Sequence, residues 1–97
     1  MEKTVRILEQ SGLQQRNYTD KKSGEQKVIN SVTLKLTDGI DTFLGEIMGE
    51  KAVNCPKYDH QYIYRVQCSM VVRGWNSQST GEVMQATTIY IDRINMV

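Results

Sequence analysis

The chain has 97 residues, and we expect a single domain spanning residues 1–97. Hydrophobic residues make up 39% and charged residues 24% of the chain, so we expect a folded soluble domain rather than a disordered chain. The net charge of +1 excludes nucleic-acid binding driven by bulk charge alone, so any such site depends on where the cations lie.

The sequence gives no sign of a membrane segment, a signal peptide or a metal site. No apolar run approaches the roughly 20 residues that a membrane span needs, and the opening MEKTVRILEQ lacks the apolar core of a signal peptide. We therefore expect a cytoplasmic protein, in which Cys55 and Cys68 are reduced thiols. Together with the single histidine, His60, they are too few for a tetrahedral site, so we expect no metal and no cofactor.

The N-terminal half alternates apolar and polar residues, as strands do. We expect a first strand over residues 4–19, with a bulge or bend at Gly12, followed by a loop over 20–26. Residues 27–39 predict a second strand that ends in a turn at Gly39. Its apolar face carries Val28, Val32, Leu34 and Leu36.

The C-terminal half predicts three more strands. A short third strand over 41–52 leads into an irregular segment, 50–60, with room for one helical turn before Pro56. A fourth strand is expected over 61–75 and a fifth over 82–97. One face of the fourth strand carries Tyr62, Tyr64, Val66, Cys68, Met70 and Val72, and the other carries Arg65, Gln67, Ser69, Arg73 and Trp75.

Five strands, of which the first is bent and the third and fourth are joined by a non-strand segment, are in the order of an OB-fold. We therefore predict an all-β, five-stranded OB-fold Greek-key barrel. A small sandwich and an SH3-like barrel have similar strand counts and remain alternatives.

Two stretches resemble bacterial single-stranded-DNA-binding proteins. Residues 66–94 resemble the family's fourth and fifth strands, where a basic-x-Trp group precedes a polar loop and a β-branched strand; the matching residues are Arg73, Trp75, Gly81, Thr87, Thr88, Ile89 and Ile91. Residues 36–52 resemble its central Gly-x-x-Ala stretch, matched by Gly49 and Ala52. The resemblance covers the chain from about residue 4 onward.

The resemblance implies an OB-fold that binds single-stranded DNA with little sequence preference, in replication, recombination or repair. It also implies a homo-oligomer, either a dimer or a tetramer, and replication or recombination proteins as partners. The family's long tail with acidic residues is missing after RINMV, which puts such recruitment in question. In size the chain is similar to tail-less relatives such as primosomal replication protein N and small phage or mobile-element proteins.

Trp75 and Arg73 are the first candidates for a binding site. An exposed ring can stack on any base, at roughly 1–3 kcal/mol per base, and phosphates need lysine or arginine nearby. Trp75 begins a polar loop beside Arg73, so we expect it to stack on a base. The alternative is that it packs under the loop or in a subunit interface.

A second group of candidates lies in or beside the first loop, which contacts ligands in OB-folds. It comprises Arg16, Tyr18, Lys21, Lys22 and Lys27. Lys35 and Arg65 lie on polar strand faces where they can follow a phosphate backbone, and Phe43 is open between stacking and core packing. Each of these cations has an ordinary alternative as a solvated surface residue. We expect Tyr62, Tyr64 and Tyr90 in the core or an interface.

Catalysis has little support, and we do not expect an enzyme. His60 lies next to Asp59 in sequence, but neighbours in sequence do not make a catalytic geometry, and motifs of nucleophilic or nucleotide-dependent enzymes are missing. The main alternative function is an OB-like protein-interaction or assembly module without nucleic-acid binding. RNA binding also remains open, because stacking does not read the 2′-hydroxyl.

The adjacent apolar pairs Ile7–Leu8 and Val71–Val72 predict side chains outside the barrel that a second subunit could cover.

Overall fold

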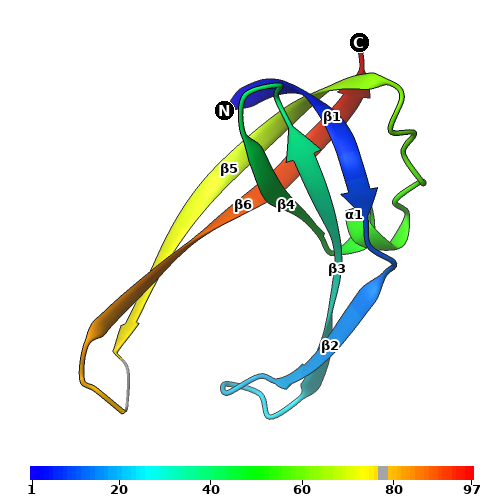
Figure 1. Cartoon of the computed structure of the whole chain (residues 1–97). Coiled ribbons are helices and arrows are strands. Elements are labelled where there is room, and N and C mark those ends of the chain that lie inside the picture. Colours follow the sequence, from blue (N-terminus) through cyan, green and yellow to red (C-terminus); the bar gives the residue numbers. More distant parts are fainter. Residues whose placement is uncertain (77–78) are drawn as a thin grey trace.

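The computed structural model describes residues 1–76 and 79–97, and nearly all of its regular structure is β (Figure 1). The elements are β1 (Glu2–Gln10), β2 (Gln14–Thr19), β3 (Gln26–Thr37), β4 (Thr42–Met48), α1 (Glu50–Val53), β5 (Ile63–Asn76) and β6 (Val83–Met96). The predicted bend around Gly12 separates β1 from β2, and α1 is the predicted single helical turn. Ser77 and Gln78, part of the polar loop expected after Trp75, lie outside the described residues.

The strands form one sheet in the order β1-β5-β6-β4-β3-β2, which closes on itself because β1 also pairs with β3. β1 lies antiparallel to the upper part of β3, with Ile7 opposite Leu36, and β2 continues along its lower part, with Arg16 opposite Ile29. β1 and β2 therefore pair with β3 in succession, as the two halves of one bent strand would. The predicted all-β, OB-like barrel is confirmed, and a two-sheet sandwich is excluded because a single sheet encloses the core.

The barrel interior is filled by alternate residues of its strands, as the alternation predicts. Leu34, Leu36 and Val66 are completely buried. The remaining core consists of Val5, Ile7, Val32, Ile47, Ala52, Tyr64, Cys68 and Ile91. Gly45 also faces inward, where an added Cβ would lie 2.6 Å from Ile91 Cδ1, so a side chain at this position would displace Ile91.

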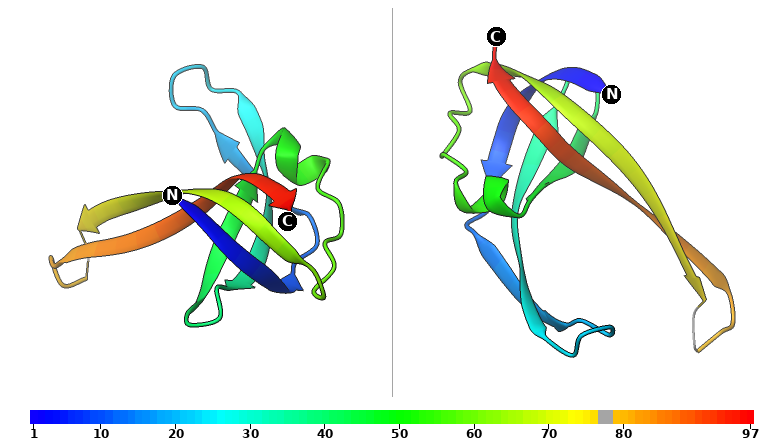
Figure 2. Two further views of the ribbon diagram at one scale, coloured as in Figure 1. Left: turned by 90° about the horizontal axis from the view of Figure 1, so that it is seen from above. Right: turned by 180° about the vertical axis from the view of Figure 1, so that it is seen from behind.

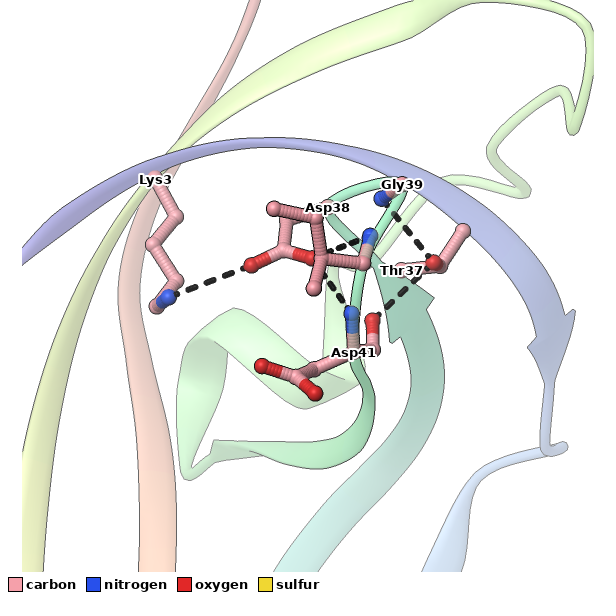
Figure 3. Close-up of polar contacts among 6 residues, drawn as sticks. Lys3, Thr37, Asp38, Gly39 and Asp41 are labelled. Carbon is pink, nitrogen blue, oxygen red and sulfur yellow. Dashed lines mark hydrogen bonds and ion pairs between the residues drawn. The ribbon is translucent and has the colours of Figure 1, made fainter.

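The predicted turn at Gly39 closes one end of the barrel (Figure 3). Asp38 Oδ1 accepts hydrogen bonds from the backbone N–H groups of Asp41, at 2.7 Å, and Ile40, at 2.9 Å. These bonds, with a smaller contribution from Lys3, hold the pKa of Asp38 below its usual value. Lys3 Nζ lies 3.4 Å from Asp38 Oδ2 and joins β1 to the turn.

Two long hairpins, β2–β3 and β5–β6, extend beyond the barrel as arms, on the side away from this turn (Figures 1 and 2). The apolar face of β3 continues onto its arm at Val28, and that of β5 continues at Met70 and Val72. These three side chains are 53–62% exposed, because no opposite wall of the barrel covers them there. In the described residues, no helix is long and apolar enough to cross a membrane.

Candidate nucleic-acid interface

A groove of about 560 Å³ lies between the two arms, near the points where they leave the barrel, and crosses the outer face of β4. Its walls and floor are formed by Gln14, Gln15, Arg16, Ile29, Ser31, Glu46, Met48, Arg73, Thr88 and Tyr90. Most of these side chains are polar, and they come from five strands that are distant in sequence. We call this surface the inter-arm groove.

The β2–β3 arm presents a basic and aromatic face to the inter-arm groove. Arg16 lines the groove, and its cross-strand partner Ile29 lines it too. Because side chains alternate along a strand, Tyr18 and its partner Lys27 share this face and lie nearer the tip. Tyr18 is 42% exposed, and Lys27 Nζ lies 3.0 Å from Asp20 Oδ2.

The β5–β6 arm forms the opposite wall. Arg73 lines the groove, where its Nη2 donates a hydrogen bond of 2.8 Å to Tyr90 Oη. Trp75 follows two residues later on the same face, nearer the tip and opposite Met84. Trp75 is 50% exposed, so part of its ring is accessible to a ligand.

The two arms thus repeat one arrangement. Each carries an arginine at the edge of the inter-arm groove, with an aromatic residue two positions farther toward the tip. The pairs are Arg16 with Tyr18 and Arg73 with Trp75. Rings in these positions can stack on bases, and the guanidinium groups can bind phosphates or base edges.

Lys21 and Lys22 lie at the tip of the β2–β3 arm and are exposed. The turn that carries them is organised by Asp20, whose Oδ1 accepts a hydrogen bond of 2.9 Å from the Lys22 backbone N–H. This bond, followed by the contact with Lys27, lowers the pKa of Asp20.

Of the predicted site residues, Arg16 and Arg73 line the inter-arm groove, and five more lie farther out along the arms. The remaining three lie away from both the groove and the projecting parts of the arms. Lys35 is on the outer face of β3, opposite Leu44 of β4 and closer to the closed end. Arg65 is on β5 eight residues before Arg73, with its Nε 3.2 Å from Glu2 Oε1.

Phe43 is the third of these residues. The sequence left open whether it stacks on a base or packs in the core, and its position favours core packing. The side chain is partly buried and packs against the core beside the closed end. Lys3 Nζ lies 5.8 Å from its ring centroid.

The tyrosines differ from one another in position. Tyr64 is buried, as predicted, and contacts Tyr58 edge to face at 5.3 Å between ring centroids. Tyr62 is 51% exposed. Tyr90, which we expected in the core or an interface, lines the inter-arm groove because it lies on the outer face of β6.

Sequence reasoning also missed Glu46, which lies on the floor of the inter-arm groove. Its alternation with the buried Ile47 marks it as an outward-facing residue, but only the closure of the barrel shows what it faces.

Other reactive side chains are dispersed over the residues that the structure describes. Within residues 1–76 and 79–97, no three His, Cys, Asp or Glu side chains gather as metal ligands would. His60 is 76% exposed beside Asp59. Cys55 and Cys68 are free thiols, and burial raises the pKa of each.

No protein-family model matches the chain, and no curated protein matches it with significance.

Proposed function

We propose that the protein binds single-stranded DNA in the inter-arm groove, without catalysis, in replication, recombination or repair. The observation that carries this proposal is the repeated pairing of an arginine with an aromatic residue on the facing sides of the arms. Stacking requires unpaired bases and tolerates any sequence, which favours a single strand over a duplex.

The proposal is tested by titrating labelled oligo-dT at increasing salt concentrations. Phosphate contacts release counterions, so the logarithm of the binding constant should fall linearly with the logarithm of the salt concentration. Oligo-rU of the same length serves as the comparison for RNA. No binding of either strand at low salt would refute the proposal.

A protein-interaction module is the alternative, and the far side of the β5–β6 arm favours it. Met70 and Val72, which follow each other on one face of β5, are each more than half exposed there, and so is Val83 nearer the tip. Exposed apolar side chains that neighbour one another are typical of protein-binding surfaces. Such a module would show no affinity for oligo-dT at any salt concentration.

Replacing Lys21 and Lys22 together by alanine is expected to weaken binding of every oligonucleotide by a similar factor. The two exposed side chains act on phosphates and carry no base information, so the salt slope should also become shallower, by roughly one unit per lost contact. Titrations of oligo-dT and oligo-dC at several salt concentrations measure both effects. An unchanged slope would mean that the arm tip points away from the strand.

We also propose that the protein is a homo-oligomer. Of the adjacent pair Ile7–Leu8, Ile7 is buried while Leu8 is 47% exposed, and Leu8 shares a shallow pocket with Ile63. Val71 and Val72 are both exposed, because β5 has left the barrel at that point. Sedimentation equilibrium at micromolar concentration should give more than the monomer mass. A monomer mass throughout would contradict the proposal.

A further inference from the structure

We propose that Glu46 makes the inter-arm groove prefer bases that carry an exocyclic amino group over thymine and uracil. This inference rests on the proposed binding of single strands, and it adds a base preference to that function. It follows from the placement of one carboxylate and one hydroxyl among the cations of the groove.

Glu46 occupies the middle of the groove floor, partly buried on the outer face of β4. Thr33 of β3 flanks it on one side, and Tyr90 of β6 flanks it on the other. In the part of the chain that the structure describes, no hydrogen bond or ion pair engages its carboxylate. The phosphates of a bound strand are repelled by this charge and attracted to Arg16 and Arg73 on the walls. The floor is therefore suited to bases.

A carboxylate accepts hydrogen bonds and cannot donate one. Cytosine offers it the amino group at N4, and adenine and guanine offer amino groups of their own. Uracil and thymine carry a carbonyl oxygen in place of the cytosine amino group. Their one donor, N3–H, lies between two carbonyl oxygens that repel the carboxylate.

Tyr90 strengthens the same preference. Its oxygen already accepts a hydrogen bond of 2.8 Å from Arg73 Nη2, which leaves its own proton to donate to a ligand. Glu46 and Tyr90 thus place an acceptor and a donor on neighbouring strands. Cytosine has the complementary pair side by side, with the amino group at N4 next to the acceptor N3.

The test compares equal lengths of oligo-dC and oligo-deoxyuridine at slightly alkaline pH. Deoxyuridine lacks the thymine methyl group, so the two strands differ only in the base edge that Glu46 and Tyr90 would contact. The wild-type protein should bind oligo-dC about fivefold or more tightly, as expected for one base-specific contact. Equal affinities, or tighter binding of oligo-deoxyuridine, would overturn the inference while leaving the proposed function intact. Binding of neither strand would refute the function itself.

The variant Glu46→Gln tests whether Glu46 causes the base preference. Glutamine can both donate and accept, so the ratio of the two affinities should fall to near one, while both affinities rise as the repulsion of phosphates is removed. Glu25→Gln is the matched control, since it removes the same charge from the exposed tip region of the β2–β3 arm. It should leave the ratio unchanged. Tyr90→Phe, which keeps the ring, should lower the ratio independently. A wild-type ratio in both groove variants would overturn the assignment.

Discussion

Trp75→Ala should weaken oligo-dT binding by about 1–3 kcal/mol, while the melting temperature stays close to that of the wild type. The ring is 50% exposed on an arm beyond the barrel, so its removal should cost the core little. Since Trp75 is the single tryptophan, quenching of its fluorescence by oligo-dT reports directly on the wild-type contact.

Trp75→Phe is the companion variant and should retain part of the affinity, because the smaller ring still offers a face to a base. A tryptophan that supported the fold would behave differently, since a buried Trp→Ala change costs roughly 3–5 kcal/mol of stability. Wild-type affinity in a folded Trp75→Ala protein would remove the residue from the site. A collapsed melting temperature would assign it to packing.

Leu34→Ala should lower the free energy of unfolding by about 2–5 kcal/mol. Leu34 is completely buried on the inner face of β3, and its truncation removes apolar contacts and leaves a cavity. Urea denaturation of the variant and the wild type measures the difference. At temperatures where the variant stays folded, its oligo-dT affinity should be unchanged, because Leu34 points away from the inter-arm groove.

Leu44→Ala provides the matched control for this change. Leu44 lies on the neighbouring strand β4 but on its outer face, where it is 60% exposed. Its truncation should change stability by no more than about 0.5 kcal/mol. Similar losses in the two variants would mean that the inner and outer faces of the barrel are assigned wrongly.

The local features of the fold could be predicted from sequence because their causes are local. Alternation within 27–39 and 61–75 indicated strands and their two faces, since successive side chains of a strand point to opposite sides. Gly12 marked the bend between β1 and β2, and Gly39 marked a turn that requires a positive φ, observed at 95°. The strand order then indicated the OB-like barrel.

The tertiary structure decided which of these faces are buried and which side chains meet. Val28 and Met70 continue apolar faces of buried strands, yet they are exposed because the arms have no opposite wall there. Arg65 shares a strand face with Arg73 but lies near the barrel end, paired with Glu2.

The candidate site also contains some residues that the sequence indicates and others that only the tertiary structure brings together. The basic-x-Trp stretch and the first loop identified Arg73, Trp75 and Arg16 from the sequence by itself, because each has a local signal of charge and aromaticity beside a turn. Glu46 and Tyr90 could not be found in this way. They become neighbours only through the parallel pairing of β4 with β6, which joins strands far apart in the chain, and no local pattern encodes such a contact.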